Sequence, residues 1–196
     1  MLTTRRIVYP VQTEALPLQT ETIGLNAEQE WISRPKGYPL FHWLQTIEGE
    51  GELLVGDTSY KLPERAGILL PPSVPHSYYA KSSAWKTYYV TFSGTLAPTL
   101  VSELLGALPG KIQWDAEDDA IREQLESMLA LAESGADAAG WKSSAELYRF
   151  LTLLKTNGRR NHLPSLSRRL ERLQELLDWL ETEYADPGLG LAEMAG

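Results

Sequence analysis

Cysteine is absent from the 196 residues of this chain. Its absence excludes disulfide bonds, thiolate catalysis and cysteine-ligated metals, and it suits a reducing compartment, so we expect a cytoplasmic protein. Long apolar runs are also missing, since none approaches the roughly 18–20 residues that a membrane-spanning helix needs. Arg5 and Arg6 near the N-terminus have no apolar stretch behind them, which is not the pattern of a secretory signal. We therefore expect no membrane partner.

Positive charge is in short supply, with 18 Lys and Arg against 26 Asp and Glu and a formal net charge of −8. Proteins that bind nucleic acid on their own usually carry a basic surface, so this chain should bind DNA weakly by itself. The charge is uneven: acidic residues gather between Asp115 and Glu133, and arginines between Arg159 and Arg172. Two solvated helix faces are the simpler interpretation, and a basic linker close to DNA is the other.

Short β-type segments are abundant between Thr22 and Phe92. Apolar or aromatic runs there are cut by Gly and Pro about every ten residues, which is typical of a barrel or sandwich. Pro71, Pro72 and Pro75 do not suit a central strand, so a loop is predicted around them. The predicted strands are Thr22–Leu25, Tyr38–Ile47, Gly51–Val55, Thr58–Leu62, Gly67–Leu70, Ser77–Lys81 and Lys86–Phe92.

After Gly94 the apolar residues recur at helical spacing. Helices are predicted over Asp115–Ser134, Ser143–Lys155 and Ser165–Tyr184. One apolar stripe consists of Leu147, Phe150, Leu151 and Leu154, and a second of Leu166, Leu170, Leu173, Leu177 and Leu180. Most such stripes pack inside their own chain.

The segment from Gly49 to Ala80 combines short strands with the glycines and prolines that the corners of a small barrel need. With its neighbours it resembles the cupin sensor domain of AraC-type transcription regulators. The matching features are Arg34-Pro35, Gly37-Tyr38, Gly49-Glu50-Gly51, Gly67 to Pro72, Pro75-His76-Ser77-Tyr78, Trp85 and Tyr89 to Gly94. The resemblance implies an α+β fold, in which a cupin-like barrel (a double-stranded β-helix, or jelly roll) is followed by an α-helical dimerisation segment.

The resemblance also divides the chain. It implies an N-terminal arm over residues 1–21, a ligand-binding barrel over 22–94 and a helical dimerisation segment over 95–164. Residues 165–196 are expected to be a linker and the truncated start of a helix-turn-helix DNA-binding domain, because the run from Leu191 to Ala195 looks like the opening of that domain. We expect DNA as a partner only through the missing C-terminal domain. A homodimer is expected through Leu147, Phe150, Leu151 and Leu154.

Six residues are candidate ligand contacts. The planar guanidinium of Arg34 can hold a sugar hydroxyl or a carboxylate, although its residue type alone favours a surface salt bridge. The resemblance gives Arg34 the position of a sugar-binding arginine, and it gives pocket positions to Tyr78, Thr87 and Tyr89. Thr87 and Tyr89 share one face of their predicted strand, and barrel core is the other interpretation of Tyr89. The remaining candidates are His42 and His76, expected at the cavity and the barrel mouth.

The two histidines do not form the metal site that catalytic cupins use. Such enzymes usually place a His-x-His pair, a carboxylate and a further histidine on the metal, but Leu44 stands two residues after His42. Two imidazoles leave a divalent ion short of ligands, so we expect no metal and no cofactor.

The expected function is non-enzymatic. We expect the ligand-sensing domain of a transcription regulator, with a small-molecule effector, a sugar or sugar derivative, bound in the barrel. A metal-dependent cupin enzyme, an isomerase or a dioxygenase, is the alternative. A purely structural barrel with a packed interior is a further one.

Overall fold

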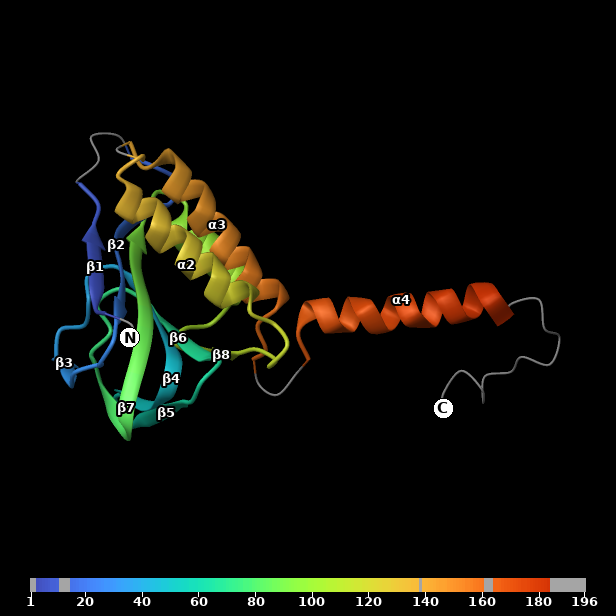
Figure 1. The fold of residues 1–196 in the computed structure, drawn as a ribbon, viewed down its shortest axis with the longest axis horizontal. Coiled ribbons are helices and arrows are strands. Elements are labelled where there is room, and N and C mark those ends of the chain that lie inside the picture. Colours follow the sequence, from blue (N-terminus) through green and yellow to red (C-terminus); the bar gives the residue numbers. More distant parts are fainter. Residues whose placement is uncertain (1–2, 11–14, 138, 161–163, 184–196) are drawn as a thin grey trace.

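The computed structural model of the chain describes residues 3–10, 15–137, 139–160 and 164–183 (Figure 1). The predicted tail segment Leu191–Ala195 lies outside the described residues. Two long strands, β4 (Phe41–Val55) and β7 (His76–Ser93), run through the centre of an antiparallel barrel. They pair with each other from Phe41 opposite Phe92 to Leu54 opposite Ser77.

Six shorter strands complete the barrel around this central pair. Neighbouring strands follow the order β1-β2-β7-β4-β6-β8. Outside this order, β3 pairs with the start of β7 and β5 pairs with the end of β4. The bounds are β1 (Arg5–Val8), β2 (Gln19–Asn26), β3 (Ile32–Arg34), β5 (Thr58–Leu62), β6 (Ala66–Leu70) and β8 (Gly110–Gln113).

Both long strands differ from the prediction, which divided each of them in two. The predicted break around Glu48 to Glu50 is an irregularity inside β4, where the pairing register shifts between Thr46 and Glu48 and again between Gly49 and Gly51. Gly49 has a φ of +81°, and a Cβ there would lie 2.0 Å from the Ala84 carbonyl oxygen. Glycine therefore lets β4 bend against β7 at this irregularity, and the pairing resumes at Gly51 opposite Ala80.

Three elements in the described residues were not predicted within the barrel and helical segments: β3, β8 and the short helix α1 (Ala97–Leu105). A fourth, β1, lies in the expected N-terminal arm. It pairs antiparallel with β2, from Arg5 opposite Leu25 to Val8 opposite Thr22, so this part of the arm extends the barrel sheet.

Three longer helices follow the barrel: α2 (Ala120–Ser134), α3 (Trp141–Thr156) and α4 (Leu166–Glu183). α2 ends at Gly135, which has the left-handed conformation typical of a helix C-terminus. Asp137 satisfies free amides at the start of α3, because its carboxylate accepts hydrogen bonds from the backbone N–H of Lys142 (3.1 Å) and Ser143 (2.6 Å). Figure 1 shows α2 and α3 side by side over the sheet, with α4 projecting away from the barrel.

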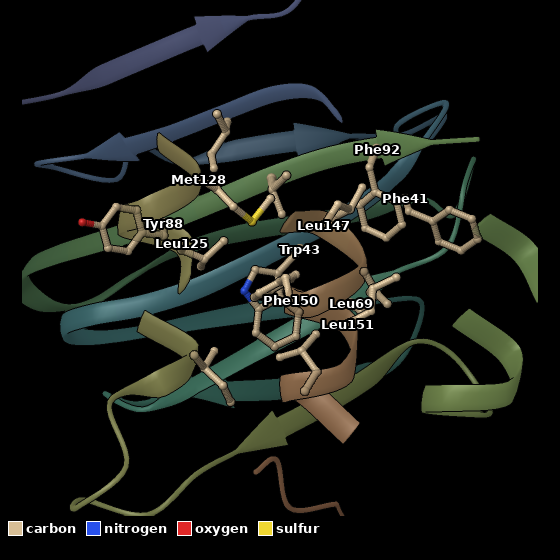
Figure 2. Packing of buried hydrophobic residues seen from close by; sticks show 14 of the residues in the cluster. Phe41, Trp43, Leu69, Tyr88, Phe92, Leu125, Met128, Leu147, Phe150 and Leu151 are labelled. Carbon is tan, nitrogen blue, oxygen red and sulfur yellow. The ribbon is translucent and has the colours of Figure 1, made fainter. Parts of the chain in front are cut away.

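Two apolar cores result, one outside the barrel and one inside it. The outer core lies between the sheet and the helices, where the Phe150 ring of α3 meets the Trp43 ring of β4 edge-on at 5.7 Å (Figure 2). The inner core fills part of the barrel interior and includes Leu44, Leu53, Leu62, Ile68, Leu70, Tyr78 and Trp85.

The four side chains expected to pair two subunits belong to the outer core. Leu147, Phe150 and Leu151 have no exposed surface, and Leu154 is 2% exposed. Figure 2 shows Leu147, Phe150 and Leu151 against Trp43 and Leu69 of the sheet. The stripe is used inside its own chain because it covers the apolar outer face of the barrel, so these side chains offer no surface to a second copy.

None of the described helices has the length and apolar character that crossing a membrane requires.

Candidate functional site

A cavity of about 360 Å³ opens into the barrel, within the usual size range of small-molecule sites. Side chains from five strands, from the β2–β3 and β3–β4 connections and from Thr4 before β1 surround it. The lining consists of Thr4, Arg6, Thr22, Asn26, Glu28, Gln29, Glu30, Ile32, Arg34, Tyr38, His42, Tyr78, Tyr89 and Thr91.

The polar side chains of the lining face the cavity because successive side chains of a strand point to opposite faces of the sheet. On β7, Tyr89 and Thr91 face the cavity, while Tyr88, Val90 and Phe92 belong to the outer core against the helices. The same alternation on β4 turns His42 inward and its neighbour Trp43 outward.

Gly24 makes room for one of these inward side chains. It lies opposite Tyr89 in the register of β2 and β7. A Cβ at this position would come within 2.5 Å of both the Tyr89 hydroxyl and the Arg5 carbonyl oxygen. The missing side chain therefore allows the Tyr89 phenol to lie beside β1, at one wall of the cavity.

Arg34 and His42 form the charged part of the cavity. Arg34 Nη1 lies 3.3 Å from His42 Nδ1, and the Arg34 guanidinium stacks 4.5 Å above the Tyr38 ring centroid. Burial, and then the positive charge of Arg34 and the nearby His76, hold the pKa of His42 well below its usual 6.5. His42 is therefore neutral at physiological pH. Because the donor-only guanidinium occupies Nδ1, we assign the ring proton to Nε2.

Glu21 anchors the hydroxyls of two lining residues next to this charged part. Its carboxylate accepts hydrogen bonds from the hydroxyls of Tyr38 (2.5 Å) and Thr91 (2.8 Å), and a longer one from Thr22 (3.4 Å). Burial, followed by the hydrogen bond to Glu21, raises the pKa of Tyr38. The Tyr38 phenol is therefore protonated and donates its proton away from the cavity.

Four of the six predicted ligand residues meet in this cavity: Arg34, His42, Tyr78 and Tyr89. His76 and Thr87 lie outside the lining. We assign the Nδ1 proton of His76 to a hydrogen bond with the Val74 carbonyl at 2.7 Å. Thr87 is fully buried and donates to the Gln29 side chain at 2.8 Å, so it holds the β2–β3 connection in place.

Several residues of the lining were not predicted from the sequence. Thr91 carried a usable signal, because it alternates in phase with Thr87 and Tyr89. Tyr38 was used only as part of the resemblance motif. Arg6 carried no signal, since only the pairing of β1 with β2 brings the arm to the cavity. Glu21 was not predicted either, because its role depends on hydrogen-bond partners that are distant in the sequence.

The two barrel histidines come close without forming a metal-binding group. Their ring centroids are 5.8 Å apart. Within the described parts of the chain, no set of three or more His, Cys, Asp or Glu side chains gathers as potential metal ligands.

Comparison with known proteins gives one family match. The sequence model of the family described as AraC-like ligand binding domain matches residues 21–151, from β2 into α3. No curated protein matches the chain at a significant level.

Solved cupin structures are similar to part of the chain. A cupin domain of an XRE family transcriptional regulator from Enterobacter cloacae is 17% identical, with 45% of this chain and 94% of that chain covered and a TM-score of 0.34. A cupin 2 conserved barrel domain protein from Salinispora arenicola is 16% identical, with 51% and 82% covered and a TM-score of 0.35. A cupin superfamily protein from Desulfitobacterium hafniense is 16% identical, with 45% and 76% covered and a TM-score of 0.34. At these values the neighbours carry no argument about function.

Proposed function

This chain belongs to the family of AraC-like ligand-binding domains, and from that membership we propose that it is the ligand-sensing domain of a cytoplasmic transcription regulator. A small polar effector, a sugar or sugar derivative, binds in the barrel and controls DNA binding by a C-terminal domain. No covalent step is involved. The observation that carries the proposal is the cavity, where directed polar groups of Arg34, His42, Tyr78 and Tyr89 converge.

The aromatic residues of the cavity support a polyhydroxylated ligand. Tyr78 and Tyr89 line it, and no hydrogen bond of either hydroxyl is found among the described residues. The Tyr78 ring stacks on His76 and is 4% exposed, so the ring face is offered by Tyr89. A ring face beside a free hydroxyl suits a sugar, which presents C–H groups on one face and hydroxyls at its edge.

β1 supports a route from the cavity to the helices. Arg6 faces the cavity, while the preceding Arg5 places Nη1 3.1 Å from both carboxylate oxygens of Glu133 at the end of α2. Ile7 packs against the outer core beside the helices. A ligand that contacts Arg6 therefore acts on a strand that also holds α2. In the proposal, this differential contact shifts the population of helix positions that the DNA-binding domain follows.

The proposed homodimer uses the exposed face of α3 in place of the buried stripe. Trp141 is 56% exposed and Tyr148 47% exposed, and their seven-residue spacing puts both on the same side of the helix. Large aromatic side chains of this kind are enriched in protein interfaces.

A thermal-shift screen of monosaccharides, oligosaccharides and organic acids tests the proposal. A ligand at about 100 times its dissociation constant should stabilise the folded chain by about 2.7 kcal/mol. Arg34→Ala should remove the shift, whereas Arg149→Ala, an equal loss of charge on α3 outside the cavity, should keep it. The sensing proposal is wrong if no compound raises the melting temperature. Stoichiometric iron, manganese, nickel or zinc in the purified chain, together with turnover, would instead support the metal-dependent cupin enzyme.

A further inference from the structure

The polar groups of the cavity differ in whether they have a free hydrogen-bond donor or a free acceptor for a ligand. A tyrosine or threonine hydroxyl has a single proton, and Tyr38 and Thr91 both donate theirs to Glu21. Only lone pairs remain on these two cavity-lining oxygens. We call this pair the acceptor wall, because it can accept hydrogen bonds from a ligand and cannot donate them.

The neighbouring pair, Arg34 and His42, has the opposite hydrogen-bonding character: Arg34 stacks on Tyr38, and His42 lies opposite Thr91 in the register of β4 and β7. The Arg34 guanidinium has five N–H donors and no acceptor, and its one hydrogen-bonding partner among the described residues is His42 Nδ1. With Nδ1 so occupied, neutral His42 keeps its proton on Nε2. We call Arg34 and His42 the donor wall, because it can donate hydrogen bonds and has no free lone pair.

The cation of the donor wall has no ion-pair partner among the described residues. Among the described residues, no carboxylate lies within 4.0 Å of the Arg34 guanidinium. The two lining carboxylates, Glu28 and Glu30, belong to exposed residues of the β2–β3 connection, and the exposed Arg6 adds a second cation to the lining. Both guanidiniums act on Tyr89, where they oppose the increase in pKa that burial causes. A half-buried cation without a counter-ion is costly, and a bound anion removes that cost.

We propose that the effector is a sugar acid, a polyhydroxylated monocarboxylate such as a uronate or an aldonate. Its carboxylate binds Arg34 and His42, and its hydroxyls donate to Tyr38 and Thr91. A neutral sugar leaves the Arg34 charge unbalanced, and a carboxylate without hydroxyls leaves the acceptor wall without donors. The exposed Glu28 and Glu30 disfavour a second negative charge on the part of the ligand at the mouth. The inference rests on the proposed sensing function and specifies the ligand class for the same cavity.

Isothermal titration calorimetry with matched probes tests this inference. The pairs are D-glucuronate with D-glucose, D-galacturonate with D-galactose, and D-gluconate with D-sorbitol, and butyrate serves as a carboxylate without hydroxyls. In at least one pair the acid should bind at least about tenfold more tightly than its neutral partner, because a charge-assisted bidentate contact is worth at least one factor of ten. Butyrate should bind more weakly than that acid.

Variants connect the preference to the two walls. Arg34→Gln should remove the difference between acid and neutral partner, and Arg149→Gln should retain it. Thr91→Val should weaken both members of a pair alike, since it removes one oxygen of the acceptor wall and leaves Arg34 and the charge of Glu21 in place. Thermal unfolding checks that each variant folds. If Arg34→Gln does not fold, Arg34→Lys keeps the charge without the planar fork and should reduce the preference.

The outcomes separate this inference from the proposed function. If a neutral sugar binds as tightly as its acid, the sugar-acid assignment is overturned and the sensing function stands. If none of the seven probes binds, the assignment is again overturned, and the wider thermal-shift screen decides the sensing function independently. Preference retained in Arg34→Gln would also overturn it.

Discussion

At the scale of single residues, the centre of the cavity depends on a histidine that the fold keeps uncharged. His42 is 1% exposed and lies beside the permanent cation Arg34. Both conditions oppose a second positive charge on the imidazole. The pKa of His76 is also lowered, first by burial and also by Arg34, against a hydrogen bond to Val74 that raises it. The barrel therefore contains two imidazoles that ionise more readily once the chain unfolds.

This predicts a loss of stability in mild acid. Each imidazole has an unfolded pKa of 6.5 and a lower folded pKa, so below pH 6.5 the unfolded chain binds protons that the folded chain does not. The free energy of unfolding should therefore fall as the pH drops from 6.5 towards the folded pKa values, with a slope of up to two protons. Urea unfolding at about pH 7.5 and about pH 5.5 measures it.

The variant His42→Gln should make this dependence shallower. The effect of Glu52 can be told apart from that of the histidines by its pH range. Hydrogen bonds from Ser59 first, and then Tyr79, lower its pKa from 4.5 to about 2. Its contribution is lost only below pH 4.5, outside the histidine window. Equal slopes in the native chain and His42→Gln would contradict the assignment to His42.

The residues of the cavity were predictable where local pattern or resemblance identified them. Arg34, His42, Tyr78 and Tyr89 were selected from the sequence and line the cavity. His76 and Thr87 were selected on the same grounds, but hydrogen bonds to Val74 and Gln29 engage them behind the lining. The role of Glu21 could not be predicted, because it depends on hydrogen bonds from Tyr38 and Thr91. Sequence alternation does not show which side chains lie next to each other on different strands.

At the scale of elements, α3 has two faces with different tasks. The buried face covers the sheet through Phe150 and its apolar neighbours, and the opposite face exposes Trp141 and Tyr148. Helical periodicity identified the apolar stripe correctly. It did not identify the surface that the stripe covers, because the pattern is the same for packing within a chain and between chains.

Two substitutions on α3 separate these tasks. Phe150→Ala removes the ring that meets Trp43 and should lower the free energy of unfolding by about 3–5 kcal/mol. Tyr148→Ala should change the stability of the monomer by no more than about 0.5 kcal/mol. In the proposed dimer, however, Tyr148→Ala should weaken self-association.

Urea unfolding and sedimentation equilibrium measure the two effects on the same samples. A Tyr148→Ala variant that self-associates as the native chain does would remove this face from the proposed interface. A Phe150→Ala variant of native stability would contradict the packing of α3 on the barrel.

Strand prediction succeeded within each ladder and failed where strands bend. β5 matches its predicted bounds, Thr58–Leu62, and β6 differs by one residue at its start. β4 and β7 were each divided because glycines and small polar residues read as turns. The register jumps there from Gly49 opposite Trp85 to Gly51 opposite Ala80, and the pairing resumes on the far side of the irregularity. β8 and β3 have only four and three residues, too few to establish a period.

At the scale of the whole molecule, Asp115 connects the barrel side to α4. Its carboxylate lies 3.1 Å from Arg159 and 3.5 Å from Arg168, which belongs to the first turn of α4. The acidic and basic stretches of the sequence thus meet here. All three side chains are partly exposed, so each contact contributes at most about 1 kcal/mol.

Asp115→Asn should therefore loosen α4 without unfolding the barrel. Amide hydrogen exchange in α4 should accelerate several-fold, while the free energy of global unfolding falls by less than about 1 kcal/mol. Glu117→Gln, an equal loss of charge at a nearby exposed residue, is the matched control. Similar exchange in the two variants would contradict the role of Asp115.

The pairing of β2 with β7 also implies a delay during synthesis, because the two strands are far apart in the sequence. Asn26 and Thr87 contact each other across 61 positions of sequence, so β2 leaves the ribosome long before its partner exists. At translation rates of 5–20 residues per second, the wait is about 3–12 s. During this interval β1 can cover only one edge of β2, and Ile23 and Leu25 have no core to enter. The nascent chain therefore exposes apolar side chains on a half-paired ribbon until β7 has been synthesised.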